Sequence, residues 1–221
     1  MTLEHLAVET GPNPRFTVIW MHGLGADGHD FEPIVPELVE PGMPALRFLF
    51  PHAPVIPVTL NNGYRMRAWY DIIGIDKRSA EDFAGMQASA DAIVKLIRRE
   101  NEAGVPTERI AVAGFSQGGA MALRIGTRLE EKLAGIIALS CYLPLAAELA
   151  AKKSAANART PIFMGHGTHD PVVPHSLGED SRAVLEAAGY RIEWHSYPMA
   201  HSVCEPEVND IRAFLARLTS S

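Results

Sequence analysis

The alternation of short apolar runs with longer helical stretches is the feature that most constrains how this sequence can fold. Six runs have the composition of β-strands, namely Phe16–Met21, Leu46–Phe50, Ile110–Ala113, Leu133–Leu139, Pro161–Met164 and Ile192–Tyr197. Most are continuously apolar, which is typical of strands that are covered on both faces. Because strands that alternate with helices build βαβ units, we expect an α/β fold with a mostly parallel central sheet and helices on both faces.

The helices are indicated by apolar residues at helical spacing. The clearest one is expected after Ser79, which together with Asp82 resembles a capping box. Its apolar residues recur over Phe83–Ile97, and the Gly-Val-Pro run at 104–106 ends it. Three further helices are expected over Gly119–Glu130, His175–Ala188 and Glu207–Leu218.

The length of the chain and two interruptions complete the predicted organisation. The 221 residues fit one domain, so we expect a single domain over 1–221. Residues 51–78 contain Pro51, Pro54 and Pro57, and are expected to be irregular. Residues 143–160 are expected to hold one short helix. Loops of this length are more often functional than idle.

Charge, apolar runs and cysteines limit the class of protein. The net charge of −6 comes from 20 basic and 26 acidic residues mixed along the chain, so no stripe predicts a nucleic-acid partner. No apolar run approaches the ~20 residues that span a bilayer, and the start of the chain has no signal-peptide pattern. Cys141 and Cys204 are expected to be free buried thiols in a reducing compartment, which favours a cytoplasmic location.

Gly114-Phe-Ser-Gln-Gly118 is the strongest chemical signal. It matches the G-x-S-x-G pattern between a strand and a helix, where a sharp turn exposes the serine hydroxyl. Glycines two residues to either side allow backbone segments to approach the turn closely. Ser116 is therefore the candidate nucleophile, and the alternative is an incidental serine in a glycine-rich connection.

A serine hydroxyl needs a base to become nucleophilic, and in hydrolases with this motif an acid and then a histidine follow the serine in the chain. His201 lies after the last predicted strand, where the base is expected, whereas His195 falls inside that strand. Asp170 lies in the loop after an earlier strand and is the candidate acid, although an aspartate there could equally form a turn. Its rival, Asp180, falls in a predicted helix.

Metal and dinucleotide sites are weaker interpretations of the same residues. His166 and His169 flank Asp170, but no third ligand at a useful spacing supports a metal site. Gly23-Leu-Gly25 begins a G-x-G pattern that the following residues do not complete as G-x-x-G. We therefore expect no metal and no cofactor.

The developing oxyanion of a substrate carbonyl needs preset hydrogen-bond donors. One candidate is the backbone N–H of Gln117, directly after the nucleophile. The other is the N–H of Leu24, in the glycine-rich loop His22–Gly28 after the first predicted strand.

Several blocks together resemble the phospholipase/carboxylesterase family, which includes the acyl-protein thioesterases. They are the runs at 22–28, 51–54, 68–74, 114–119, 139–144, 166–174 and 201–202, in the family's order. The resemblance implies an α/β-hydrolase fold, a triad of Ser116, Asp170 and His201, and an oxyanion hole from Leu24 and Gln117. It also implies an apolar acyl channel, whose lining by motif position includes Tyr70, Ile73, Tyr142 and Val172. Tyr142 and Ala200 depart from the residues usual in the eukaryotic thioesterases, which puts the preferred acyl length in doubt.

These expectations combine into a serine carboxylesterase or thioesterase that acts on a small ester or acylated substrate. Because a free imidazole titrates near ~6.5, activity is expected to rise from acidic to mildly alkaline pH. A lysophospholipase differs only in the leaving group and stays an alternative. A peptidase and a non-catalytic binding protein are less favoured, because the chain is too short for a gating domain and has all three triad residues. A homodimer is also compatible with the sequence.

Overall fold

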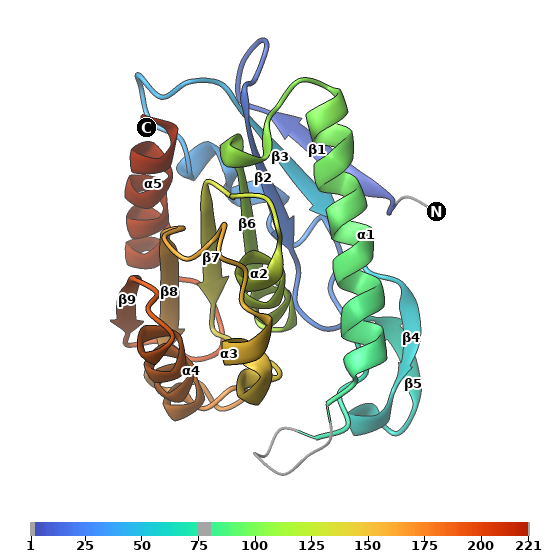
Figure 1. The fold of residues 1–221 in the computed structure, drawn as a ribbon. Coiled ribbons are helices and arrows are strands. Elements are labelled where there is room, and N and C mark those ends of the chain that lie inside the picture. The colour runs from blue at the N-terminus through green and yellow to red at the C-terminus, as the bar shows by residue number, and fades with distance from the viewer. Residues whose placement is uncertain (1–2, 75–80, 221) are drawn as a thin grey trace.

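Seven strands form one central sheet in the computed structural model, which describes residues 3–74 and 81–220 (Figure 1). In spatial order they are β1 (His5–Glu9), β3 (Leu46–Pro51), β2 (Phe16–Met21), β6 (Ile110–Phe115), β7 (Gly135–Leu139), β8 (Ile162–Gly167) and β9 (Ile192–Tyr197). Strand β1 pairs antiparallel with β3, and every other pairing in this sheet is parallel. The expected α/β fold with a mostly parallel sheet is confirmed.

Helices cover both faces of the sheet (Figure 1). One face carries α1 (Phe83–Glu102), α2 (Gln117–Arg128) and α4 (His175–Ala187), and the other carries α5 (Glu205–Thr219) and the 3₁₀ segment η1 (Glu32–Glu37). Strand β2 shows why both faces need cover, since Ile19 packs on the first side and Val18 on the second, and neither is exposed. No helix in the described part of the chain is long and apolar enough to cross a membrane.

The start of α1 differs from the expected capping box. Asp82 is itself the N-cap residue, and its carboxylate accepts the N–H of Gly85 at 2.9 Å. Ser79 lies outside the described residues. Because aspartate caps a helix as well as serine does, the prediction placed the cap three residues too early.

The stretch 51–78 is more regular than expected. It contains a hairpin of β4 (Val55–Val58) and β5 (Tyr64–Arg67), and Asn62 and Gly63 take left-handed conformations in its turn. The hairpin was not predicted because Pro57 lies inside its first strand, and a proline within an apolar run argues against a strand. The stretch 143–160 holds the single short helix that was expected, α3 (Leu149–Lys152), after a 3₁₀ turn.

The order of the strands decides which loops meet. Strands β2, β6, β8 and β9 run in the same direction, so the loops that follow them emerge at the same edge of the sheet. These loops carry the glycine-rich run 22–28, Ser116, Asp170 and His201. In open α/β sheets this carboxyl edge is where ligands bind.

Candidate active site

Ser116 occupies a strained turn between β6 and α2. Its φ of 53° and ψ of −118° lie in a region that L-residues rarely adopt. The turn packs so tightly that a Cβ on Gly118 would lie 2.1 Å from the carbonyl oxygen of Met21, and one on Gly114 would lie 2.3 Å from the backbone of Gly118. Both glycines of the motif are therefore required by close backbone approach.

Ser116, His201 and Asp170 form a continuous hydrogen-bonded chain. The His201 Nε2 lies 2.9 Å from the Ser116 Oγ, and the Nδ1 lies 2.6 Å from the Asp170 Oδ2. With the Nδ1–H donated to the carboxylate, Nε2 is free to accept the hydroxyl proton. The ring of Phe115 packs against the imidazole, with 4.7 Å between their centroids. This arrangement suits a serine that is activated by a general base.

The Asp170 side chain is fully buried and held by the loop that carries it. Its Oδ1 accepts the backbone N–H groups of Val172 at 2.8 Å and Val173 at 2.9 Å. Its Oδ2 faces His201 and also lies 3.5 Å from the Nε2 of His166. The carboxylate therefore has one oxygen for its own loop and the other for the base.

His166 is a supporting residue whose role the sequence did not reveal. It is 1% exposed, and its Nε2 donates to the carbonyl of Val173 at 2.9 Å. Burial lowers the pKa of His166, which favours the neutral ring with its proton on Nε2. Its position four residues before Asp170 suggested only a metal site, and the described residues contain no cluster of His, Cys, Asp or Glu that could hold one.

Gln117 contributes differently through its side chain and its backbone. The buried side chain accepts the N–H of Trp69 and donates to the carbonyl of Tyr70, both at 2.8 Å. The backbone N–H belongs to the first residue of α2, and such groups have no partner within their own helix. Of the two, the backbone N–H is the group that suits an oxyanion.

Leu24 lies in a loop that is anchored beside the nucleophile. A Cβ on the preceding Gly23 would lie 3.6 Å from the Cβ of Ser116, and the N–H of the following Gly25 donates to the carbonyl of Arg67 at 2.8 Å. His22 fixes the start of the loop, because its Nε2 accepts the N–H of Ala53 at 3.1 Å while its Nδ1 lies 2.7 Å from the carbonyl of Gly23. Burial lowers the pKa of His22 and so favours this neutral form.

Comparisons with known proteins agree on one family. The phospholipase/carboxylesterase family model matches residues 3–219. The chain belongs to this family. It is 44% identical over 208 residues to acyl-protein thioesterase 1 of Neurospora crassa, covering 90% of this chain and 85% of that protein. It is 38% identical to acyl-protein thioesterase 1 of Mycosarcoma maydis, covering 95% and 93%.

Solved structures show the same fold. The structure of Arabidopsis thaliana SOBER1 matches with a TM-score of 0.87 at 30% identity, over 92% of this chain and 99% of that one. Acyl-protein thioesterase 2 of Zea mays matches with a TM-score of 0.88 at 26% identity, over 98% and 99%. This member of the phospholipase/carboxylesterase family is therefore an α/β-hydrolase and a serine hydrolase of esters or thioesters.

The four expected channel residues separate into two pairs. The hydroxyls of Tyr70 and Tyr142 lie 3.2 Å apart, and burial raises the pKa of both. The side chains of Ile73 and Val172 are 45% and 50% exposed. The structure thus joins the two tyrosines and leaves the two aliphatic residues at the surface.

His195 and Asp180, the alternatives to the proposed base and acid, lie outside the hydrogen-bonded chain of Ser116. His195 is half-buried in β9, where it stacks on Phe163 and lies 3.4 Å from the carboxylate of Asp210. Asp180 lies in α4, as expected. Both cysteines are free, but only Cys141 is buried, so the expectation of two buried thiols is wrong for Cys204.

Proposed function

We propose that Ser116 is the nucleophile, His201 the general base and Asp170 the partner of the base in the hydrolysis of carboxylic esters or acyl thioesters. The observation that carries this assignment is the chain of two short hydrogen bonds from the Ser116 Oγ through the imidazole to the Asp170 carboxylate. These three side chains come from distant parts of the sequence, and the structure brings them into one hydrogen-bonded chain.

The reaction would proceed in two acyl transfers. The Ser116 oxygen attacks the carbonyl carbon as His201 takes its proton, and Asp170 stabilises the resulting imidazolium. The N–H groups of Leu24 and Gln117 would hold the oxyanion. The imidazolium then gives its proton to the departing alcohol or thiol, which leaves an acyl ester on Ser116. Water, deprotonated by His201, releases the acid and restores the serine.

The substrate class follows from the relatives. Their names describe thioesterases of acylated proteins, and we extend this to acyl thioesters and related small esters as substrates of this chain. Tyr70, Ile73, Tyr142 and Val172 are proposed to contact the acyl chain. A lysophospholipase would use the same machinery, and a series of acyl thioesters, p-nitrophenyl esters and lysophospholipids, compared by kcat/KM, distinguishes the two.

Fluorophosphonate labelling tests the nucleophile. The parent protein should be labelled and Ser116→Ala should not, while Ser202→Ala, an exposed serine beside the proposed base, should be labelled like the parent. Persistent labelling of Ser116→Ala would discard the assignment. A parent protein that is neither labelled nor active on esters would instead support a non-catalytic binding protein.

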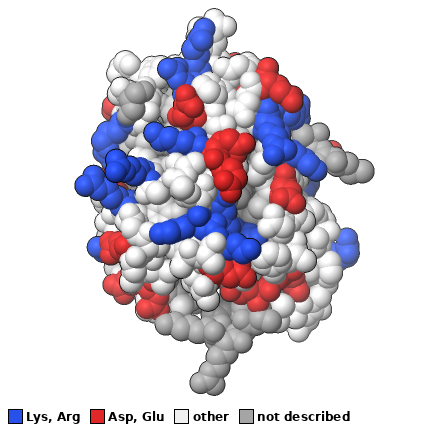
Figure 2. All heavy atoms as spheres, viewed as in Figure 1, with Lys and Arg blue, Asp and Glu red and all other residues white. Residues whose placement is uncertain are grey.

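Location and assembly are separate proposals. The two free cysteines support a cytoplasmic location, where thiols stay reduced. Basic and acidic side chains are interspersed over the face shown in Figure 2, which favours a small-molecule or acylated substrate over nucleic acid. A homodimer stays a prediction that sedimentation velocity would test.

A further inference from the structure

A hollow lies at the opposite edge of the sheet from the triad. Its volume is about 300 Å³, and its walls come from the amino ends of the parallel strands. Phe16 begins β2, Arg109 directly precedes β6, Ala134 directly precedes β7 and Pro161 directly precedes β8. Ser116, Asp170 and His201 follow the carboxyl ends of strands, so a ligand here would not occupy the catalytic centre.

The walls of this hollow carry an excess of positive charge. Arg15, Arg109, Lys132 and Arg159 line it, against one carboxylate, Glu108. This concentration is notable because the whole chain has a net charge of −6. All four residues are exposed, so water and salt screen part of their mutual repulsion, and an anion bound between them would relieve the rest.

The side chains of the four cations have no direct partner within the described part of the chain. None of their side chains has a hydrogen bond or ion pair with a described residue. Several arginines elsewhere are paired, as Arg47 is with Glu9 at 2.9 Å, Arg128 with Glu148 at 3.9 Å and Arg182 with Glu186 at 2.8 Å. Arg98, Arg99 and Arg191 also lack such a partner among the described residues, but they do not line this hollow.

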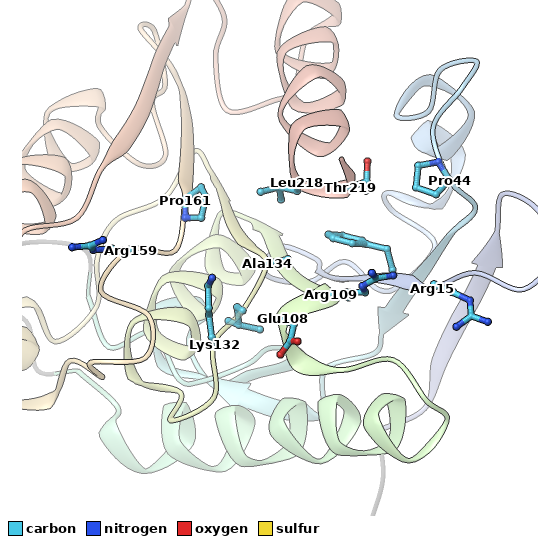
Figure 3. Close-up of a pocket in the computed structure, with 12 residues that line it drawn as sticks. Arg15, Pro44, Glu108, Arg109, Lys132, Ala134, Arg159, Pro161, Leu218 and Thr219 are labelled. Carbon is cyan, nitrogen blue, oxygen red and sulfur yellow. The ribbon is translucent and has the colours of Figure 1, made fainter. Parts of the chain in front are cut away.

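The hollow also has an apolar floor. Phe16 is 5% exposed and Leu133 is fully buried, and Pro44, Pro161 and Leu218 extend the apolar wall. Figure 3 shows Lys132 and Arg109 near the middle of the hollow, with Arg15 and Arg159 toward its two ends. An occupant would therefore meet cations on the rim and apolar surface beneath.

We propose that this hollow binds a small organic phosphate, with the phosphate on the cationic rim and an apolar group on the floor. A phosphate oxyanion matches guanidinium groups in charge and in bidentate geometry, and it carries more charge than a single carboxylate. The volume suits a small molecule, being at the lower end of ligand pockets in general. The site is independent of the proposed chemistry at Ser116.

Phenyl phosphate and inorganic phosphate are the probes, and backbone amide shifts in ¹H–¹⁵N NMR spectra are the readout. Phenyl phosphate should shift the amides around Arg109, Lys132 and Leu218 and should bind about tenfold tighter than inorganic phosphate, because only it covers the floor. Arg109→Ala/Lys132→Ala should weaken binding at least about tenfold. The matched control, Lys95→Ala/Arg98→Ala, removes the same two residue types from exposed positions on α1 and should bind like the parent.

Four results would overturn the proposal. One is the absence of amide shifts at about 10 mM phenyl phosphate, since a site with millimolar affinity would then be mostly filled. The second is equal weakening in the pocket variant and in the control, which would indicate a general charge effect. The third is equally tight binding of benzoate, which would remove the preference for phosphate. The fourth is binding confined to vesicles that contain phosphatidic acid, which would make the occupant a membrane surface.

Discussion

The turn that carries Ser116 and the loops that carry Asp170 and His201 reach the same point by different means. The turn is held mainly within a few residues, by the positive φ of Ser116 and by the approach of Gly114 to Gly118, and Gly118 in addition packs against the backbone of Met21 at the end of β2. The two loops are held to each other, since the N–H of Thr168 donates to the carbonyl of Tyr197 at 2.8 Å and that of His169 to Met199 at 3.1 Å. One half of the site is thus set largely by local backbone geometry, and the other by contacts between distant segments.

This difference predicts how each half will fail. A change in the nucleophile turn should disturb folding, because the backbone there has no room to relax. A change in the loops of Asp170 and His201 should first disturb the alignment of these two side chains with Ser116. One hydrogen bond between the loops can be lost while the others remain. Three substitutions test this contrast, and a fourth, Glu207→Gln, tests a buried carboxyl next to β8. They are given from the largest expected effect to the smallest.

Asp170→Asn should lower kcat by about 10⁴-fold with little change in stability, because an amide would favour the wrong tautomer of His201. Steady-state kinetics and circular dichroism measure the two effects. Asp180→Asn is the matched control and should keep full activity. If Asp180→Asn lost activity and Asp170→Asn kept it, the assignment of the acid would be wrong.

Gly118→Ala should cost at least about 3 kcal/mol of unfolding free energy, because its Cβ would overlap the carbonyl oxygen of Met21. Urea unfolding measures this cost. Gly104→Ala is the control, since Gly104 has a φ of 95° but an alanine Cβ there would meet nothing within 4 Å. It should cost only about 1 kcal/mol for the left-handed backbone. Equal costs would remove close approach as the reason for the glycine.

Glu207→Gln should change stability in a pH-dependent way. Glu207 lies in the first turn of α5 against Gly165 of β8, fully buried, and its carboxyl oxygens have no hydrogen-bond partner among the described residues. Burial, with a smaller contribution from Asp210, raises the pKa of Glu207 from 4.5 to about 8. The folded protein therefore keeps this carboxyl protonated at pH values where the unfolded chain ionises it.

The sign of the effect follows from this difference. The stability that the protonated Glu207 contributes is complete below pH 4.5 and declines as the pH rises to about 8, by up to about 1.4 kcal/mol per pH unit. Glu207→Gln should lack this decline, so its advantage over the parent grows from pH 5 to pH 8 in urea unfolding. Glu205→Gln, an exposed change on the same helix, should follow the parent. A difference that is constant with pH would contradict the prediction.

His166→Phe should lower kcat by about tenfold and leave KM nearly unchanged, because it removes the donor that holds Val173, whose own N–H holds Asp170. Initial-rate kinetics on an ester substrate separate kcat from KM. His195→Phe is the control in the neighbouring strand and should leave both constants unchanged. A loss confined to KM would place His166 with substrate binding instead.

The fold was largely predictable where neighbouring residues decide the structure. The bounds of β2 and β9 match the expectation. Strand β2 is a continuous, fully buried apolar run, which reports a buried strand directly, whereas β9 is a half-buried edge strand that its Ile, Trp and Tyr residues indicate. Strand β1 and the β4–β5 hairpin were missed, because these short strands are mostly unburied and depend on a partner more than on their own pattern. The hydrogen bond from His166 to the carbonyl of Val173 was also missed, because it too depends on a tertiary contact.

The sequence by itself determined the strand–helix rhythm and the position of the nucleophile turn, since side-chain periodicity and the approach of Gly114 to Gly118 act over a few residues. Only the tertiary structure decided that His201 and Asp170 meet Ser116, that Tyr70 meets Tyr142, and that four cations surround a hollow at the far edge. These contacts depend on the order of the strands in the sheet, which arises from many weak contacts between distant segments. No short stretch of the chain encodes them.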